Sequence, residues 1–229
     1  MCILIVENTS DTCILWFNRD DSKDRVSDEF KESDTVFYHL DKRNWWTWIG
    51  NNVKWEIVAL LNNDWQSRDW RTTRWNIVVD ILEWENNLDT LESQLSQYNP
   101  FQLFYYYNNV ARIIYWNGRS FSEELLEWNF RKVMSSSSYS YECKLKRKAD
   151  WEEIIKKFPH LTDDILKKIL SNHYSWNQEI TESSIQMKWA WSETLSTSII
   201  EFDKIEQKMK HSVKSILKKN YRDFIMNTL

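Results

Sequence analysis

Two short apolar runs near the start of the chain limit the possible fold more than any other feature. Residues 2–6 and residues 13–17 are each long enough for one β-strand, and a polar break separates them. This pattern predicts a β-hairpin that is buried on at least one face. In an antiparallel pair, the start of the first strand lies beside the end of the second. We therefore expect the hairpin to bring Cys2 close to Arg19 and Asp20.

The position of Cys2, directly after Met1, has a chemical meaning. An initiator methionine is usually removed when the next side chain is small, and removal would give Cys2 a free α-amine. With a reference pKa of about 7.7–8.0, an α-amine can act as a general base near neutral pH. It would take the thiol proton and return it to a leaving amine. Arg19 is expected to lower the pKa of the thiol, and Asp20 to hold the ammonium group.

These motifs resemble the NRDE family, also called the transport and Golgi organisation protein 2 family. Members of that family open with Met-Cys and carry Asn-Arg-Asp-Glu after the second strand. This chain has Met1-Cys2 and Asn18-Arg19-Asp20-Asp21, so that an aspartate replaces the glutamate. Further similar stretches are residues 45–50, 60–63, 73–75 and 98–101, with weaker ones at 135–138 and 194–200.

The resemblance implies the fold and the domain organisation. It implies an α+β fold, a four-layer αββα sandwich like that of N-terminal nucleophile hydrolases, with mainly antiparallel sheets. We expect one NRDE-like domain over residues 1–229, in which residues 204–229 form a C-terminal tail or helix.

Two functions follow from the resemblance, and the sequence leaves both open. In the first, the protein hydrolyses a linear amide bond in a small molecule or short peptide. Cys2 is then the nucleophile, and Arg19 and Asp20 orient and tune it. In the second, the protein is a non-catalytic carrier or trafficking protein, linked to haem or lipid handling or to secretory organisation.

Further residues are candidates for the site. Asn62 either donates to a developing oxyanion or is a turn residue. Arg74 either binds a substrate carboxylate or is a solvated charge at a helix start. Ser136 stands where the family commonly has asparagine, and is either a second oxyanion donor or part of a serine loop. Asn18 and Asp21 complete the expected substrate-binding set.

The chain has far fewer glycines, and far more tryptophans, than an average protein of its length. The chain has 2 Gly and 15 Trp, whereas average usage predicts roughly 16 Gly. Several tryptophans stand where turns or family glycines belong: Trp16, Trp45, Trp46, Trp55, Trp75, Trp189 and Trp191. We hypothesise that most Trp are UGA codons that a bacterial source with an alternative genetic code reads as glycine. The alternative is a Trp-rich core or stacking platform.

The amino-acid composition limits which binding partners and which cellular compartment are expected. A net charge of −4 gives no reason to expect nucleic acid as the main partner. No apolar run approaches the roughly 18 residues of an integral membrane span. Three cysteines make no disulfide framework, so a reducing, cytoplasmic setting is expected. No metal-ligand cluster or cofactor fingerprint is visible, so no cofactor is expected, and the oligomeric state stays open.

The remaining elements follow from periodicity. Hairpins are expected at residues 47–61 and 101–116, and single strands at 36–40, 131–134, 184–188 and 196–202. Helices are expected at residues 74–84, 87–97, 142–158 and 163–170, with a helical turn at 122–128. Apolar residues at helical spacing favour a C-terminal amphipathic helix after residue 204, although residues 204–210 would also suit a strand.

Overall fold

The computed structural model describes most of the chain, and it divides the chain into two compact units. The first unit comprises Met1–Val26 and Asn129–Leu229, and the second comprises Ser27–Trp128. The described residues are 2–22, 28–41, 46–63, 74, 76–83, 87–136, 141–158, 160–162, 164–165, 192–215 and 220–227. The prediction of one domain over the whole chain stays a prediction.

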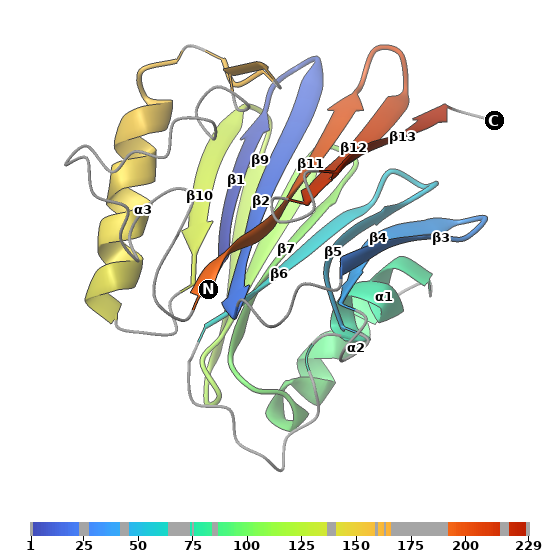
Figure 1. Ribbon diagram of the computed structural model, residues 1–229. Helices are drawn as coiled ribbons and strands as arrows, with labels where there is room; N and C mark the ends of the chain where they lie inside the picture. Colours follow the sequence, from blue (N-terminus) through green and yellow to red (C-terminus); the bar gives the residue numbers. More distant parts are fainter. Residues whose placement is uncertain are drawn as a thin grey trace. The chain divides into compact units, whose positions relative to one another are not determined.

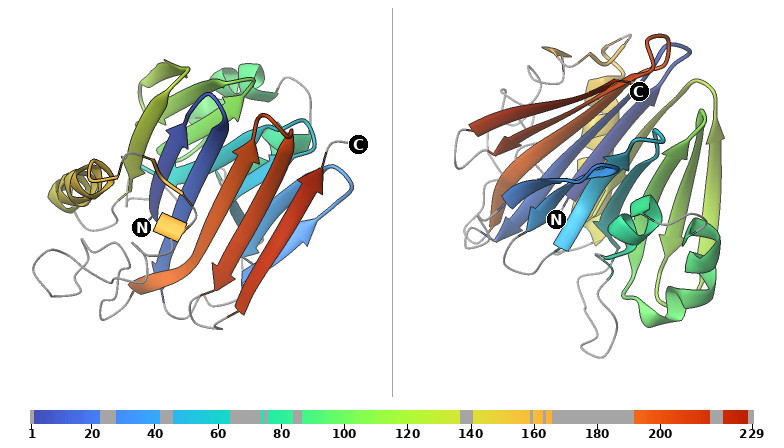
Figure 2. Two further views of the ribbon diagram at one scale, coloured as in Figure 1. Left: turned by 90° about the horizontal axis from the view of Figure 1, so that it is seen from above. Right: turned by 90° about the vertical axis from the view of Figure 1, so that its right-hand side faces the viewer.

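The first unit is built on a six-stranded antiparallel sheet with the strand order β10-β1-β2-β11-β12-β13 (Figure 1). Its strands are β1 (Cys2–Asn8), β2 (Thr12–Ser22), β10 (Phe130–Ser135), β11 (Ser192–Asp203), β12 (Lys208–Ser215) and β13 (Asn220–Asn227). Figure 2 shows β11, β12 and β13 side by side at one end of this sheet.

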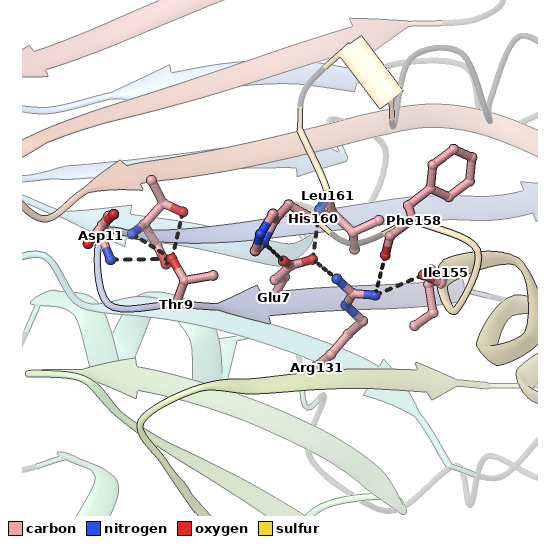
Figure 3. A network of polar contacts seen from close by, with 9 residues as sticks. Glu7, Thr9, Asp11, Arg131, Ile155, Phe158, His160 and Leu161 are labelled. Carbon is pink, nitrogen blue, oxygen red and sulfur yellow. Dashed lines mark hydrogen bonds and ion pairs between the residues drawn. The ribbon is translucent and has the colours of Figure 1, made fainter.

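The predicted N-terminal hairpin is confirmed. Strands β1 and β2 pair antiparallel, and Cys2 lies directly opposite Arg19. Thr9 closes the turn between the strands, because its Oγ1 accepts hydrogen bonds from the backbone N–H groups of Asp11, at 3.3 Å, and Thr12, at 3.0 Å (Figure 3). The turn therefore fixes the register that places Cys2 beside Arg19.

Helix α3 (Tyr141–Ile155) packs on one face of this sheet. Its Trp151 and Ile155 contact side chains that alternate along the strands, as expected for one face of a pleated sheet. The members of this core from β1 and β2 are Ile3, Ile5, Ile14 and Trp16. Odd-numbered residues of β1 therefore face α3, whereas Cys2 lies on the opposite face of the sheet.

A buried carboxylate on β1 holds the chain that follows α3 (Figure 3). Glu7 is 5% exposed and pairs with Arg131 at 2.7 Å. It also accepts the Leu161 backbone N–H at 2.8 Å. The same Arg131 donates to the carbonyl oxygens of Ile155 and Phe158. Arg131 thus satisfies the carbonyl oxygen of Ile155, the last residue of the helix, where carbonyl groups lack helical partners, and Glu7 satisfies the backbone N–H of Leu161 beyond it.

The second unit contains a seven-stranded antiparallel sheet with the order β3-β4-β5-β6-β7-β8-β9. Its strands are β3 (Asp28–Glu32), β4 (Val36–Asp41), β5 (Trp46–Asn52), β6 (Ile57–Asn62), β7 (Phe101–Tyr107), β8 (Val110–Trp116) and β9 (Phe121–Glu127). Helices α1 (Asn76–Glu83) and α2 (Asn87–Gln94), followed by the 3₁₀ turn η1 (Leu95–Gln97), pack against it around a core that includes Val58, Leu60, Ile77 and Leu103.

At position 50 on β5, the neighbouring atoms leave no room for a Cβ atom, so that Gly50 is required. A Cβ atom there would lie 2.8 Å from Leu82 Cδ1 and 2.9 Å from the carbonyl oxygen of Phe37. Because backbone atoms of a sheet cannot move aside cheaply, only glycine fits. This glycine ends the family-like stretch at residues 45–50.

Two predicted helical segments are strands. Residues 121–127 form β9, not a helical turn. The C-terminal helix expected after residue 204 is also wrong, because β12 and β13 occupy this part of the chain. Asp203 Oδ1 accepts the backbone N–H groups of Ile205 and Glu206, each at 2.9 Å, and so forms a turn that ends β11. Nearly all of the predicted helix at 163–170 and all of the strand at 184–188 lie outside the described residues.

Two tryptophans adopt a backbone conformation that favours glycine. Trp55 has φ 66° and Trp128 has φ 61°, and the Trp128 side chain is exposed. Residues with a Cβ atom pay roughly 1–2 kcal/mol in this left-handed region. Trp16, by contrast, lies in the middle of β2 and not at a turn, with its ring fully buried. The tryptophans therefore fall into at least two structural groups.

We expect Trp55→Gly and Trp128→Gly each to raise the free energy of unfolding by about 1 kcal/mol, because glycine removes the left-handed strain at some entropic cost. Chemical denaturation of the two variants and the parent measures this. Under the genetic-code hypothesis the gene should carry UGA at both positions and UGG at Trp48. A loss of stability in both variants, or UGG throughout, would contradict the assignment.

Candidate active site

Cys2 begins β1 and lies between two neighbouring strands. It is 6% exposed, with β10 on one side and Arg19 of β2 directly opposite on the other. In the next strand, Ser196 of β11 lies opposite Arg19. Because directly opposed residues of antiparallel strands share a face, Cys2, Arg19 and Ser196 form a row across one face of the sheet.

The Arg19 guanidinium is held by a carboxylate on its own strand. Arg19 Nη2 donates to Asp21 Oδ2 at 3.1 Å, and the Arg19 side chain is only 5% exposed. The other oxygen of Asp21 accepts the Ser22 backbone N–H at 2.9 Å. Asp21, which was expected to bind substrate, therefore fixes the arginine beside Cys2.

Asn18 and Asp20 brace the sheet with their side chains. Asn18 lies opposite Ile3, on the face that α3 covers. Its Oδ1 accepts hydrogen bonds from Trp16 Nε1 at 2.9 Å and from Thr197 Oγ1 at 2.8 Å. Asp20 Oδ1 accepts from Thr194 Oγ1 at 2.5 Å. These contacts tie β2 to β11 at the end of the hairpin that carries Cys2.

The pKa of the Cys2 thiol is raised above its ordinary value, not lowered as expected from Arg19. Burial is the main cause, since it disfavours the thiolate, and the charges of Asp20 and Asp21 add to the increase. The positive amino terminus and a hydrogen bond from the backbone of Asp20 act in the opposite direction. The resting thiol is therefore neutral at pH 7, and a nearby base is needed to remove its proton.

The raised pKa predicts slow alkylation of Cys2 in chain that retains Met1. Because only the thiolate reacts, the rate with iodoacetamide should keep rising with pH beyond the range of an ordinary thiol, whose pKa is about 8.5. Peptide mass spectrometry of Cys2 between pH 6 and pH 10, with glutathione as the reference thiol, measures this. A rate that levels off below pH 8 would show that the thiol pKa is lowered instead.

Ser136 contacts the backbone of Cys2. The Cys2 nitrogen donates to Ser136 Oγ at 2.8 Å, and the Ser136 backbone N–H donates to the Cys2 carbonyl oxygen at 3.0 Å. The hydroxyl also lies 3.4 Å from the same carbonyl oxygen, as a donor. Ser136 is 1% exposed. The structure thus brings this predicted residue to Cys2, at its nitrogen.

Asn62 and Arg74, both in the second unit, contact each other. Arg74 Nε donates to Asn62 Oδ1 at 2.6 Å, and Arg74 is largely buried. The arginine is therefore not a solvated charge at the start of α1. With its oxygen held by Arg74, Asn62 keeps its Nδ2 group for donation. The neighbouring Asn63 bonds to the carbonyl oxygens of Pro100 and Trp116, and so joins strand ends.

The comparisons with known proteins bear on this arrangement. The family model described as Transport and Golgi organisation 2 matches residues 1–223. The chain belongs to this family. No curated protein matches the chain by sequence. The family assignment predicted from Cys2 and the Asn-Arg-Asp motif is confirmed.

A solved structure resembles this Transport and Golgi organisation 2 family protein in fold. It is a Caenorhabditis elegans N-acylethanolamine-hydrolyzing acid amidase ortholog, with a TM-score of 0.58 and 12% sequence identity. The match covers 87% of this chain and 92% of that one. The α+β fold with mainly antiparallel sheets, like that of N-terminal nucleophile hydrolases, is therefore confirmed.

Three hydroxyl residues near the site of this family member were missed by sequence reasoning. Thr194 and Thr197 hold Asp20 and Asn18, as described above, and Ser196 lies beside Arg19. Among the described residues, Ser196 Oγ is buried without a hydrogen-bond partner. The signal that could have revealed them is the run of small hydroxyl side chains at Ser196, Thr197 and Ser198 within this strand.

The described part of the chain holds no group of three or more His, Cys, Asp or Glu side chains arranged to bind a metal ion. Within the same part, no helix is both long and apolar enough to cross a bilayer.

Proposed function

We propose that the protein is an N-terminal cysteine nucleophile hydrolase that cleaves a linear amide bond in a small molecule or short peptide. The observation that carries this proposal is the position of Cys2. It starts β1 opposite Arg19, and removal of Met1 would give it a free α-amine. The amidase named in the structural neighbour's title supports an amide as the substrate class.

In the proposed reaction, the Cys2 α-amine removes the proton from its own thiol, and the thiolate attacks the amide carbonyl carbon. The C–N bond then breaks, and the leaving amine takes the proton from the α-ammonium. A thioester on Cys2 remains. Water, activated by the same amine, hydrolyses this thioester to a carboxylic acid and restores the thiol. Because burial raises the pKa of the thiol, an adjacent base such as this amine favours its deprotonation.

The surrounding residues have matching roles in the proposal. Arg19, held by Asp21, supplies positive charge beside the thiolate, and Ser196, whose buried hydroxyl has no hydrogen-bond partner among the described residues, is proposed to contact substrate. Asn62, whose oxygen Arg74 holds, is the proposed oxyanion donor. Neither Cys2 nor Cys13 forms a disulfide, as expected in a reducing cytoplasmic setting.

One observation favours the second function, a non-catalytic carrier or trafficking protein. The thiol of Cys2 is buried and its pKa is raised, which is typical of a structural cysteine. In that case the thiol would only pack against its neighbours, and no covalent intermediate would form.

Intact-mass spectrometry of the purified protein tests the proposal in two steps. The first step asks whether Met1 is absent. The second step asks whether incubation with a medium-chain N-acyl p-nitroanilide adds one acyl group to the peptide that begins with Cys2. We expect loss of Met1 and a transient acyl adduct. Processed protein that forms no adduct with acyl chains of several lengths would favour the carrier.

A further inference from the structure

We propose that Ser136 is a positioning residue for the α-amine of Cys2, and not an oxyanion donor. This inference rests on the proposed function, because it concerns the amine that serves there as the base. The Cys2 nitrogen and Ser136 Oγ are 2.8 Å apart, and both residues are almost fully buried. The nitrogen that donates as an amide in the unprocessed chain becomes the amine when Met1 is removed.

The backbone holds Ser136 in place independently of its side chain. Its N–H donates to the Cys2 carbonyl oxygen at 3.0 Å, directly beyond the last residue of β10. This bond extends the ladder between β10 and β1, in which Ser135 pairs with Ile3. The separation between the hydroxyl and the Cys2 nitrogen is therefore set by strand pairing and not by a mobile loop.

The direction of the hydrogen bonds defines what the hydroxyl can do. Ser136 Oγ donates to the Cys2 carbonyl oxygen at 3.4 Å, so its lone pairs are free to accept from the Cys2 nitrogen. A neutral amine that donates one N–H to Ser136 cannot rotate freely about its bond to Cα. Its lone pair is then held in one orientation, which is what transfer of the thiol proton requires.

The same contact has an electrostatic consequence. An acceptor beside the amine stabilises the ammonium form and raises the pKa of the amine. Among the described residues, the charged groups near Cys2 include Asp20, Asp21 and Arg19, the last of which pairs with Asp21. A serine substitution leaves all three unchanged. A shift in the pKa of the amine on removing the hydroxyl would therefore report the contact itself.

Ser136→Ala in the processed protein tests this proposal. We expect the acylation rate at high pH to fall by roughly tenfold, as for loss of one hydrogen bond. We also expect the midpoint of the pH–rate profile to move down by about half a unit to one unit. Ser136→Thr, which keeps the hydroxyl, should restore both. Ser135→Ala is the matched control, because strand alternation directs that side chain to the opposite face, and it should change neither quantity.

A second measurement does not depend on catalysis. Protein labelled with ¹⁵N-cysteine gives the pKa of the Cys2 amine by NMR titration, and we expect a lower value in Ser136→Ala than in the parent and Ser136→Thr. Equal amine pKa values, or unchanged rate and midpoint in an active parent, would overturn the role of Ser136. An inactive parent whose amine pKa still shifts would refute the proposed hydrolase and support the contact.

Discussion

Replacement of Cys2 with alanine is expected to abolish the acyl adduct and to lower amide hydrolysis by on the order of 10⁴-fold or more, as for removal of other enzyme nucleophiles. Alanine at this position is also small, so Met1 should still be removed and the α-amine retained. The variant therefore isolates the sulfur from the amine. Intact-mass spectrometry and the release of p-nitroaniline provide the two measurements.

Cys13→Ala is the matched control for this experiment. Cys13 is a fully buried cysteine that forms no disulfide, at the far end of the same hairpin, where it pairs with Asn8. Its loss should leave the adduct on Cys2 unchanged. An adduct that persists in Cys2→Ala would exclude Cys2 as the nucleophile. Full biological rescue by Cys2→Ala would favour the carrier function instead.

The second large effect is on stability. Trp16→Gly is expected to lower the free energy of unfolding by about 3–5 kcal/mol through loss of the buried ring, and by a further 0.5–1 kcal/mol or so for glycine in a strand. Trp16 is fully buried among Ile3, Val133 and Trp151, and its Nε1 donates to Asn18. Urea denaturation monitored by circular dichroism measures the change.

Trp128→Gly is the informative comparison for this variant. It makes the same change in composition at an exposed, left-handed position, where a gain in stability is expected. Opposite signs for the two variants would show that only some tryptophans stand in for glycine. A neutral or stabilising Trp16→Gly would contradict the packed core around Trp16 and extend the genetic-code hypothesis to β2.

Local patterns predicted the hairpins well, because a hairpin is encoded within one short stretch of sequence. The register that pairs Cys2 with Arg19 follows from two short apolar runs and one turn. The hairpin at residues 101–116 has Asn108 and Asn109 at φ 50° and 65°, as a two-residue turn requires. In both cases neighbours in sequence are also neighbours in space.

The C-terminal strands were not predicted, because their apolar residues fit two periods. Ile205 and Met209 are four residues apart, which is typical of a helix. Within β12, however, Met209, His211 and Val213 are all buried, with a period of two. Ile205 is exposed in the turn before the strand. Pairing with β11 determines that this segment forms a strand and not a helix. A single sequence does not show that pairing.

The contacts of the candidate site were predicted only where they are local in the sequence. Cys2 and Arg19 come together through local pairing, but the bond between Cys2 and Ser136 joins residues 134 positions apart. The pair Asn62 and Arg74 was predicted as two separate residues, although one hydrogen bond links them. These contacts depend on side-chain direction and on long-range strand pairing. A short sequence motif specifies neither.

The strand order of the first unit has a consequence for biosynthesis. β1 is made first, but its neighbour β10 begins only at Phe130, and β11 follows at Ser192. At translation rates of about 5–20 residues per second, β1 waits several seconds or longer for β10. During that interval the nascent amino terminus has no partner strand on its β10 side. Under the proposed function, Met1 would therefore be removed on the ribosome, before the sheet closes around Cys2.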